Sequence, residues 1–567
     1  MKWTPLAWTL ALAYAGSAAP AIAQTSQSPQ PKAAASRAVL KPFLWENATV
    51  YFLLTDRFEN GNRANDLAYG RQADAAPLRG FMGGDLAGVT ARIASGYFDS
   101  LGVNAIWITP PVEQIHAGTD EGTGKSYGFH GYWARDWTAV DANLGTEQDF
   151  RDLVDAAHAR GIRVLLDVVM NHTGPVTPAD TVWPADWVRS DPVCTYQDTA
   201  TNVDCTLVAN LSDVRTDRDA PVALPPFLAA KWRAEGRYER EVAELDAFFA
   251  RTGYPRAPRY YLMKWHADWV RKFGIDGFRA DTVKHTEPGV WKELRTVADA
   301  AYEDWKRAHP GKALGDGKFY MVGEIYNYNI ATGQQFDMGK GEIVNFFPHG
   351  FDSMINFGLV HDAKRDYESV FAAYSAQLQG PLKPYGVLNY LSSHDDGNPF
   401  DPARSRPFES ANKLLLAPGA AQIYYGDETA RRLDVAEAAG DAKLRSYMNW
   451  DDLAANAARD GYKVADVRAH WSRLGLFRQA HVAVGAGVHR KLADRPYTFA
   501  RTYAGKGMSD KVVVALDVPP APRSAITVRG VFADGQRLRD YYSGAMVTVK
   551  NGQVELAVQG GVVLLGQ

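Results

Sequence analysis

The feature that most constrains the fold is an alternation of short apolar runs and amphipathic helix patterns that begins at about residue 48. Near-continuous apolar strands that alternate with helices indicate a parallel sheet covered on both faces. One intervening segment places Phe150, Leu153, Val154 and Ala157 at the spacing of a buried helical face. The strand candidates are residues 50–54, 103–108, 164–169, 277–283, 319–325, 351–357, 387–392 and 421–425.

Eight strand–helix units over about 430 residues fit an α/β fold of the (β/α)₈ TIM-barrel type. An open doubly wound sheet is the alternative, and it is weakened because no Gly-rich dinucleotide fingerprint opens any unit. The alternation stops where prolines, polar turns and both cysteines indicate an insertion after the third strand, called domain B below. Strand patterns dominate the end of the chain, where Asn551-Gly552 is typical of a β-hairpin. We expect the barrel over 43–172 and 261–483, domain B over 173–260, and an antiparallel C-terminal β-sandwich over 484–567.

The first 23 residues have the pattern of a secretory signal peptide. Lys2 gives a positive start, residues 6–13 are apolar apart from one threonine, and Ala21-Ile22-Ala23 is a small-x-small cleavage site. An uncleaved anchor is the alternative. Residues 24–42 are expected to form a flexible leader. We expect export to the periplasm or the medium and no membrane association after cleavage, because no later stretch holds 18 consecutive apolar residues.

The charge balance and the cysteine count exclude several classes of protein. The chain has 62 Lys and Arg against 65 Asp and Glu, a formal net charge of -3. Nucleic-acid-binding proteins normally carry a basic excess, so we expect no nucleic-acid partner. Two cysteines are too few for a disulfide scaffold or a cysteine-rich metal cluster. In an exported chain we expect Cys194 and Cys205 to form a disulfide with each other.

Polar residues follow several of the predicted strands. Barrel enzymes place their catalytic groups at the C-terminal ends of strands. Here three strand ends carry Asp281, Glu324 and Asp395, and Arg279 stands next to the first. Such a set suits metal-assisted hydrolysis, in which His and carboxylates hold a divalent ion. It equally suits glycoside hydrolysis, which needs a carboxylate nucleophile and a carboxylic acid. The spacing of the residues does not decide between the two.

Four segments resemble, in order, the signature regions of the α-amylase superfamily of glycoside hydrolases: residues 167–172, 277–285, 322–324 and 392–395. The insertion resembles that family's domain B and the β-rich tail its domain C. The resemblance is greatest to periplasmic and secreted α-amylases. It implies a retaining hydrolase that cleaves α-1,4 bonds in starch or maltodextrins by double displacement, and a monomer. The alternatives are a transglycosylase, a cyclodextrin- or pullulan-cleaving relative, and an inactive glycan-binding subunit, which the three retained carboxylates disfavour.

The resemblance also assigns roles to residues. Asp281 is expected to be the nucleophile, Glu324 the acid/base, and Asp395 the carboxylate that binds sugar hydroxyls and favours the oxocarbenium-like state. Arg279 is expected to keep Asp281 ionised, and Tyr132 to stack on the reacting sugar. The other expected substrate-binding residues are His172, His394, His130, Trp133, Lys284 and His285.

Calcium is the metal that the resemblance implies, and oxygen ligands suit this hard cation. The first expected site comprises Asn171, Asp213 and the backbone carbonyl of His285. The second resembles the additional calcium loop of cyclodextrin glycosyltransferases, although an ordinary Asx-rich turn is the alternative. Its expected residues are Asn60, Asn62, Asn65, Asp66, Gly83 and Asp85.

Overall fold

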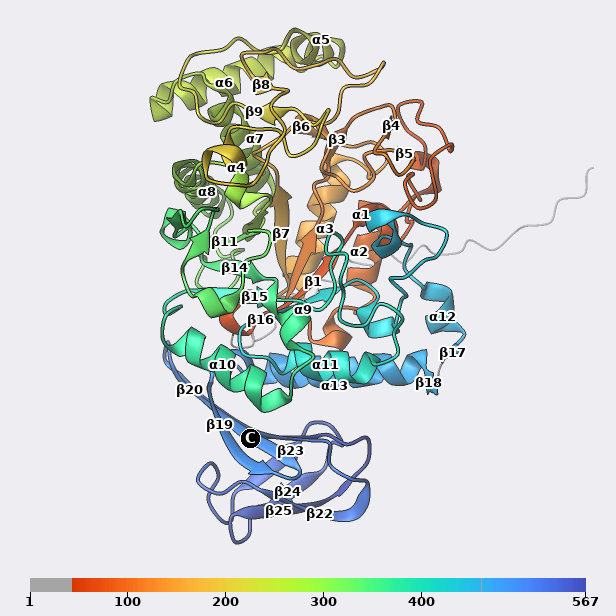
Figure 1. The fold of residues 1–567 in the computed structure, drawn as a ribbon, viewed down its shortest axis with the longest axis vertical. Coiled ribbons are helices and arrows are strands. Elements are labelled where there is room, and N and C mark those ends of the chain that lie inside the picture. The colour runs from red at the N-terminus through yellow and green to blue at the C-terminus, as the bar shows by residue number, and fades with distance from the viewer. Residues whose placement is uncertain (1–42, 460) are drawn as a thin grey trace, which may run out of the picture. The chain divides into compact units, whose positions relative to one another are not determined.

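The computed structural model describes residues 43–459 and 461–567 (Figure 1). The predicted signal peptide and leader, residues 1–42, lie outside the described residues. In the part of the chain that is described, none of the helices combines the length and the hydropathy of a membrane span.

Parallel strands close into a barrel at the centre of the molecule, in the order β1-β16-β15-β14-β11-β10-β7-β2. The predicted (β/α)₈ fold is therefore confirmed. Every strand candidate from the sequence overlaps one barrel strand. Their bounds are β1 (Thr49–Leu53), β2 (Ala105–Ile108), β7 (Arg163–Val168), β10 (Gly277–Ala280), β11 (Tyr320–Gly323), β14 (Ser353–Asn356), β15 (Gly386–Asn389) and β16 (Ala420–Tyr424).

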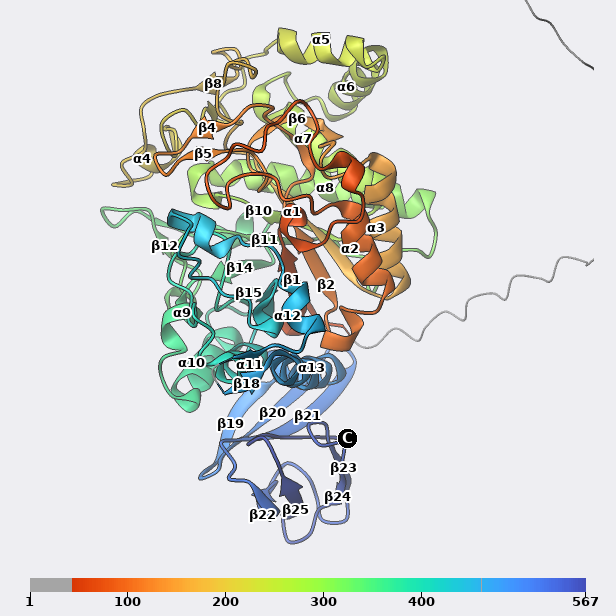
Figure 2. The same cartoon turned by 90° about the vertical axis from the view of Figure 1, so that its right-hand side faces the viewer.

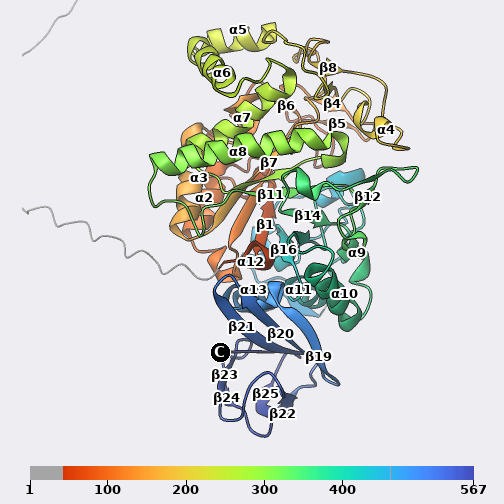
Figure 3. The same cartoon turned by 90° about the vertical axis from the view of Figure 1, so that its left-hand side faces the viewer.

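Helices surround this barrel. In the third unit, Thr146 and Asp149 form a reciprocal capping box, and Phe150 and Val154 are among the side chains buried against the sheet. The capping box satisfies backbone donors that the first helical turn leaves unpaired, so the helix begins where the sequence predicts. Figure 2 shows α2 beside α3, and Figure 3 shows α7 beside α8. The main helices are α2 (Leu86–Ala94), α3 (Glu147–Ala159), α7 (Pro258–Phe273), α8 (Pro288–Ala308), α10 (Tyr367–Gln379), α11 (Pro407–Leu415) and α13 (Val464–Ala480).

The insertion after β7 forms its own small elements, which are β8 (Val188–Arg189), α4 (Ala200–Val203), β9 (Asp213–Val214), α5 (Pro226–Ala234) and α6 (Tyr238–Thr252). The expected disulfide between Cys194 and Cys205 is present. The backbone N–H of Val214 donates to the carbonyl of Asn171 at 2.7 Å, which holds the insertion to the end of β7. Helices α5 and α6 are separated at Gly236, which adopts a left-handed φ of 69°.

The C-terminal region is antiparallel, as predicted. Its larger sheet has the order β19-β20-β21-β26-β23-β24, and β22 pairs with β25 in a second sheet. Val513, Leu538 and Leu565 from the larger sheet pack with Ile526 and Val554 from the smaller one in a shared hydrophobic core. The strand bounds are β19 (Val488–Asp494), β20 (Tyr497–Gly505), β21 (Met508–Leu516), β22 (Ala521–Thr527), β23 (Arg537–Asp540), β24 (Met546–Thr548), β25 (Gln553–Val558) and β26 (Val563–Gly566).

The hairpin predicted around Asn551-Gly552 is correct in its turn and wrong in its strand pairing. Lys550 and Gln553 exchange backbone hydrogen bonds of 2.8 and 3.0 Å across the turn, and Asn551 and Gly552 have φ values of 53° and 72°. Beyond the turn β24 pairs with β23, whereas β25 pairs with β22. The two runs therefore enter opposite sheets, which lets the apolar face of β25 cover the core between them.

Helix α13 packs against the barrel and hydrogen-bonds to segments that precede and follow its strands. The buried guanidinium of Arg478 donates to the carbonyls of Leu415 at 3.0 Å and Asn47 at 3.2 Å. One turn earlier, Gly475 allows the helix backbone to approach the loop before β2, because a Cβ at this position would lie 1.9 Å from the Leu101 carbonyl oxygen. Only glycine permits this close approach, so packing determines the residue at position 475 although glycine has a low helix propensity.

Replacing Gly475 with alanine should therefore destabilise the protein. The methyl group would force α13 off the Leu101 backbone, and overpacking of this kind costs roughly 1–3 kcal/mol in the free energy of unfolding. Gly289→Ala in α8 is the matched control, because a Cβ there meets nothing within 4 Å. The control should be neutral or stabilise by up to about 1 kcal/mol. Urea unfolding measures both variants, and equal effects would contradict this account of the packing.

Candidate active site

Two of the predicted carboxylates follow neighbouring barrel strands. Asp281 comes directly after β10 and Glu324 directly after β11, and the two strands pair with Ala280 opposite Gly323. The register therefore places the two carboxylates side by side at the C-terminal end of the barrel. Arg279 joins them, with Nη1 at 2.6 Å from Asp281 Oδ1 and Nη2 at 2.6 Å from Glu324 Oε1. The structure thus brings together three of the residues predicted from the sequence.

Asp167, to which no role was assigned from the sequence, also contacts this guanidinium. It lies on β7 directly opposite Arg279, and its Oδ1 is 2.9 Å from Arg279 Nη1. Its Oδ2 accepts from Tyr132 Oη at 2.7 Å and from Trp107 Nε1 at 3.1 Å. Asp167 is the only acidic residue of the apolar run Arg163–Val168, and a carboxylate in such a strand was a signal that could have found it.

Burial gives the two reacting carboxylates different pKa values. Burial, opposed by Arg279 and reinforced by the negative charge of Asp281, raises the pKa of Glu324 to about 7. Burial raises the pKa of Asp281 to about 6, against the opposing effect of Arg279. Both pKa values are raised, and that of Glu324 is the higher of the two. Carboxylates whose surroundings separate their pKa values can act as an acid and a nucleophile in one site.

The predicted histidines gather around Tyr132. His172 Nε2 lies 3.1 Å from the Tyr132 carbonyl, His130 Nδ1 accepts from the Tyr132 N–H at 3.1 Å, and the His394 ring stacks on Tyr132 with ring centres 5.2 Å apart. Burial lowers the pKa of His172 to about 4 and those of His130 and His394 well below the usual value. At neutral pH the three rings are uncharged, so they can exchange hydrogen bonds with hydroxyl groups without attracting anions.

Asp395 lies in the loop after β15, and its side chain is 52% exposed. Arg445 contacts it, with Nη2 at 3.5 Å from Asp395 Oδ1, while Nε of the same arginine donates to the His394 carbonyl at 2.9 Å. Arg445 was missed in the sequence, because it follows the last barrel strand in a segment without any periodic pattern. It anchors the loop that carries both His394 and Asp395.

The remaining predicted substrate residues lie in two places. Trp133 is 6% exposed and packs with Ile115 and Leu211, and its ring centre lies 4.6 Å from that of His130. Lys284 and His285 lie in a short 3₁₀ turn, Val283–His285, that follows Asp281. That turn starts at the left-handed Thr282, whose N–H donates to Glu324 Oε2 at 3.2 Å.

The residues of the first predicted calcium site lie together. Asn171 Nδ2 donates to Asp213 Oδ1 at 2.7 Å and to the His285 carbonyl at 3.0 Å. The side-chain amide can rotate by half a turn, which would direct its oxygen at the other two and complete a set of three oxygen donors. Oxygen donors from carboxylate, amide and carbonyl groups are the ligands of a calcium ion, so these residues fit it.

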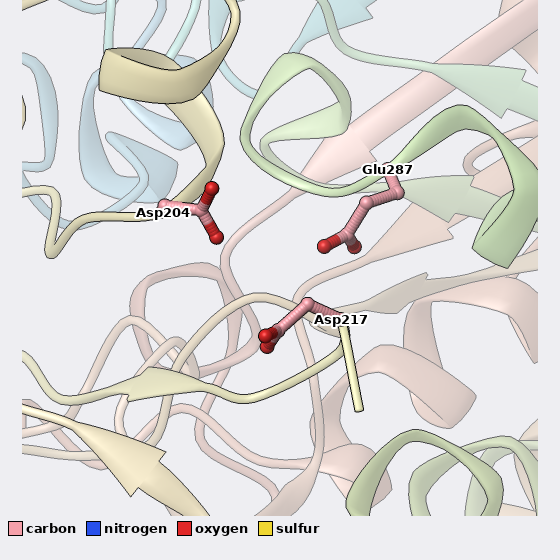
Figure 4. Close-up of side chains that lie close together, drawn as sticks. All are labelled: Asp204, Asp217 and Glu287. Carbon is pink, nitrogen blue, oxygen red and sulfur yellow. The ribbon is translucent and has the colours of Figure 1, made fainter. Parts of the chain in front are cut away.

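Further carboxylates surround this site, which the sequence analysis did not predict. Asp204, Asp217 and Glu287 each offer an oxygen within 4.8 Å of the others, and Figure 4 shows their side chains directed toward a shared space. The Arg189 guanidinium contacts Asp204 at 2.7 Å, Asp213 at 2.9 Å and Asp217 at 2.5 Å. The single charge of Arg189 thus contacts three carboxylates, and Glu287 lies beside two of them. This excess of carboxylates is a donor set suited to an additional hard cation.

The second predicted calcium loop fits a cation only in part. Asn60 Oδ1 and Asn65 Oδ1 are buried, and neither has a hydrogen-bond partner among the described residues. Gly83 approaches the side chains of Asn60 and Asp66 so closely that a Cβ would lie 2.5 Å from Asn60 Nδ2 and 2.9 Å from Asp66 Oδ1. Asp85, in contrast, accepts the N–H groups of three residues, Gly61, Asn62 and Gly88, and caps α2. The side chain of Asn62 likewise caps the 3₁₀ turn Arg63–Asn65 by accepting from Ala64.

A (β/α)₈ barrel that carries paired carboxylates of unequal pKa at the C-terminal ends of its strands, held by one arginine, defines a glycoside hydrolase. Known proteins agree with this class. Residues 52–199 match the family described as "Alpha amylase, catalytic domain". The periplasmic alpha-amylase of Escherichia coli (strain K12) is 37% identical over 531 residues, which cover 83% of this chain and 72% of that protein.

The alpha-amylase of Streptomyces lividans is 29% identical, and the match covers 83% of this chain and 54% of that protein. The solved structure of an Anoxybacillus alpha-amylase matches with a TM-score of 0.63 and 22% identity over 93% of this chain and 99% of that chain, which shows the common fold. The chain belongs to the α-amylase family of glycoside hydrolases.

Because Arg279 contacts both Asp281 and Glu324, a substitution of Asp281 should change the pKa of Glu324. Asp281→Asn should lower that pKa below about 7, because the negative charge of Asp281 raises it and because Arg279 would be left to Glu324 alone. Carbon-13 NMR of side-chain-labelled glutamate measures the shift. Asp494→Asn is the control, since that side chain is 83% exposed and distant in sequence from the site. A higher or unchanged pKa in Asp281→Asn would show that the two carboxylates are not coupled.

Proposed function

We propose that the protein is an exported, retaining α-glucan hydrolase that cleaves α-1,4 bonds in starch and maltodextrins by double displacement. The observation that carries the proposal is the contact of one buried guanidinium with both Asp281 and Glu324, at 2.6 Å each. This contact keeps the carboxylate with the lower pKa ionised beside one that holds a proton near neutral pH. An ionised nucleophile beside a protonated acid is the starting state of a retaining glycosidase.

In the first step, Glu324 gives its proton to the glycosidic oxygen while an Asp281 oxygen forms a bond to the anomeric carbon. The bond from that carbon to the leaving oxygen breaks, and the leaving chain departs with a new hydroxyl group. In the second step, Glu324, now a carboxylate, takes a proton from water, and the water oxygen replaces Asp281 on the anomeric carbon. Two inversions leave the α-configuration unchanged.

The surrounding residues support these steps. Asp395, half exposed beside the pair, would accept hydrogen bonds from hydroxyl groups of the reacting glucose and favour its distorted form. The Tyr132 ring, fixed by its hydrogen bond to Asp167 and by the His394 ring, would contact the apolar face of that glucose. Uncharged His172 and His394 would bind its hydroxyl groups. Arg279 would act by positioning both carboxylates, since it lies beneath them with 1% of its side chain exposed.

We further propose that calcium binds between the barrel and domain B, at Asn171, Asp213 and the His285 carbonyl. The charge excess of the carboxylates around Arg189 supports this site. The unpaired oxygens of Asn60 and Asn65 support a second ion at residues 60–66. Calcium would stabilise the fold and would not take part in bond cleavage. Action as a monomer in the periplasm or the medium completes the proposal, in keeping with the name of the Escherichia coli relative.

Asp281→Asn should abolish turnover of a maltodextrin while leaving the chain folded. An amide oxygen is a far weaker nucleophile than a carboxylate, and losses of catalytic groups of this kind reduce kcat on the order of 10⁴-fold or more. Reducing-sugar release measures the rate, and thermal melting tests the fold. Asp494→Asn should retain full activity. Near-normal turnover by Asp281→Asn would overturn the assignment of the nucleophile.

Removing calcium should lower the melting temperature. An ion that binds only the folded state, present at a hundred times its Kd, stabilises that state by about 2.7 kcal/mol. Differential scanning calorimetry with and without a calcium chelator measures the loss, and elemental analysis counts the bound ions. Asn171→Ala should show a smaller chelator effect than the parent protein. An unchanged melt together with no calcium in the purified protein would contradict the proposal.

A further inference from the structure

The orientation of the Asp395 side chain depends on the backbone that carries it. This side chain is 52% exposed, and Arg445 Nη2 lies 3.5 Å from Asp395 Oδ1, which is long for a charge-assisted hydrogen bond. A half-exposed carboxylate with so long a contact is not held in one direction by that contact. The groups that fix the backbone at this position therefore fix the direction in which the carboxylate meets a substrate.

Backbone and side-chain contacts fix the ends of the loop that carries this carboxylate. The Phe400 N–H donates to the Leu391 carbonyl at 2.9 Å and closes the loop between these two residues. Near the start of the loop, Ser392 Oγ donates to Asp427 Oδ1 at 2.6 Å. These contacts lie at the ends of the loop, so the middle, where Asp395 stands, needs a separate anchor.

The neighbouring residue Asp396 supplies this anchor. Its Oδ2 accepts a hydrogen bond from Tyr390 Oη at 2.7 Å, and its Oδ1 accepts from the Asn398 N–H at 3.0 Å. Asp396 is only 8% exposed, so its side chain points inward while that of Asp395 points to solvent. A buried carboxylate is costly unless it is hydrogen-bonded, so the tyrosine hydroxyl group holds Asp396 in place.

The hydroxyl group of Tyr390 is itself fixed to the barrel wall. Tyr390 comes directly after β15 and Phe357 directly after β14, and these two strands pair with each other. The ring centres of the two residues lie 5.4 Å apart, and the residues are 1% and 8% exposed, respectively. Packing of this kind leaves the ring little freedom. A continuous series of contacts therefore runs from the barrel wall through Tyr390 and Asp396 to the backbone of Asp395.

We propose that Tyr390 and Asp396 are positioning residues that hold Asp395 in the orientation that binds the reacting glucose in its distorted form. The inference rests on the role proposed above for Asp395. Neither positioning residue would contact the sugar, and their effect on the reaction would pass through the Asp395 carboxylate. Small displacements of a group that binds the transition state reduce the rate strongly, so the loss of one anchoring hydrogen bond should be measurable.

Tyr390→Phe removes the hydroxyl group and keeps the ring. It should lower kcat for maltoheptaose about tenfold, as expected for a hydrogen bond to a charged group. The KM should change less than about twofold, because an undistorted sugar chain does not need the oriented carboxylate. Tyr374→Phe is the matched control, since Tyr374 is 2% exposed on the outer helix α10 and donates to Asp362 Oδ2 at 3.0 Å. The control should retain the kcat of the parent protein.

A double-mutant cycle tests whether the effect passes through Asp395. The probe is acarbose, a pseudo-oligosaccharide whose flattened terminal ring resembles the oxocarbenium-like sugar, and calorimetry measures its Kd without turnover. Tyr390→Phe should raise the Kd about tenfold in the parent protein and less than about twofold in an Asp395→Ala background. A general structural defect would instead weaken binding equally in both backgrounds.

Replacement of Asp396 gives a second, independent measurement. Asp396→Leu removes both hydrogen bonds and should lower kcat at least as much as Tyr390→Phe does. Asp396→Asn should restore kcat to within about twofold of the parent value. Its amide oxygen can accept from the Asn398 N–H while its amide nitrogen donates to Tyr390 Oη. Thermal melting confirms that each variant is folded at the assay temperature.

Three results would overturn the inference. These are a parental kcat in both Tyr390→Phe and Asp396→Leu, an equal loss of acarbose affinity in the two backgrounds, and a kcat of Asp396→Asn as low as that of Asp396→Leu. In each of these cases the role proposed for Asp395 would still stand. Parental acarbose affinity in Asp395→Ala itself would instead refute that role, and the inference with it.

Discussion

The contacts of Arg279 with Asp281, Glu324 and Asp167 are the interaction on which the rest of the site depends. A guanidinium buried to this extent is costly unless carboxylates surround it, and carboxylates buried beside it are equally costly without it. Three barrel strands, β7, β10 and β11, supply these four residues in register. The pairing of the barrel strands therefore determines which charged side chains contact one another. Removing Arg279 would leave three buried carboxylates without their common partner.

This arrangement separates the roles of two chemically similar groups. Burial alone would raise both pKa values, and an arginine alone would lower both. The two effects together leave the pKa of Asp281 at about 6 and that of Glu324 at about 7. In the proposed mechanism Glu324 acts first as an acid and then as a base, so a pKa near the working pH suits it in both steps.

Much of the fold could be predicted from the sequence because its signals are local. The apolar runs of the barrel strands, the capping box at Thr146 and the turn at Asn551-Gly552 each depend on a few neighbouring residues. The strand partners of β24 and β25 could not be predicted, since they depend on which of the two sheets each apolar face packs against. The packing of Trp133 against Ile115 and Leu211 could not be predicted for a similar reason, because a motif fixes the position of a residue in the chain and leaves the direction of its ring open.

The candidate site also contains residues that local sequence predicts and residues that depend on distant contacts. Asp281, Glu324 and Arg279 were found because strand ends and family motifs mark them, and Asp167 could have been found as a carboxylate within an apolar strand. Arg445 contacts Asp395 and the His394 carbonyl, which are far away in the chain, and no sequence pattern around Arg445 indicates those contacts. The group formed by Asp204, Asp217 and Glu287 likewise depends on domain B meeting the start of α8.

The central claim is that Asp281 forms a covalent bond to the substrate while Glu324 supplies the proton. A fluorinated glycosyl fluoride that forms a glycosyl-enzyme quickly and releases it slowly tests this directly. After reaction, proteolysis and mass spectrometry should find the sugar on the peptide that contains Asp281, attached through that carboxylate. Attachment at Glu324 or Asp395, or rapid turnover without any attached sugar in the presence of an active enzyme, would contradict the account.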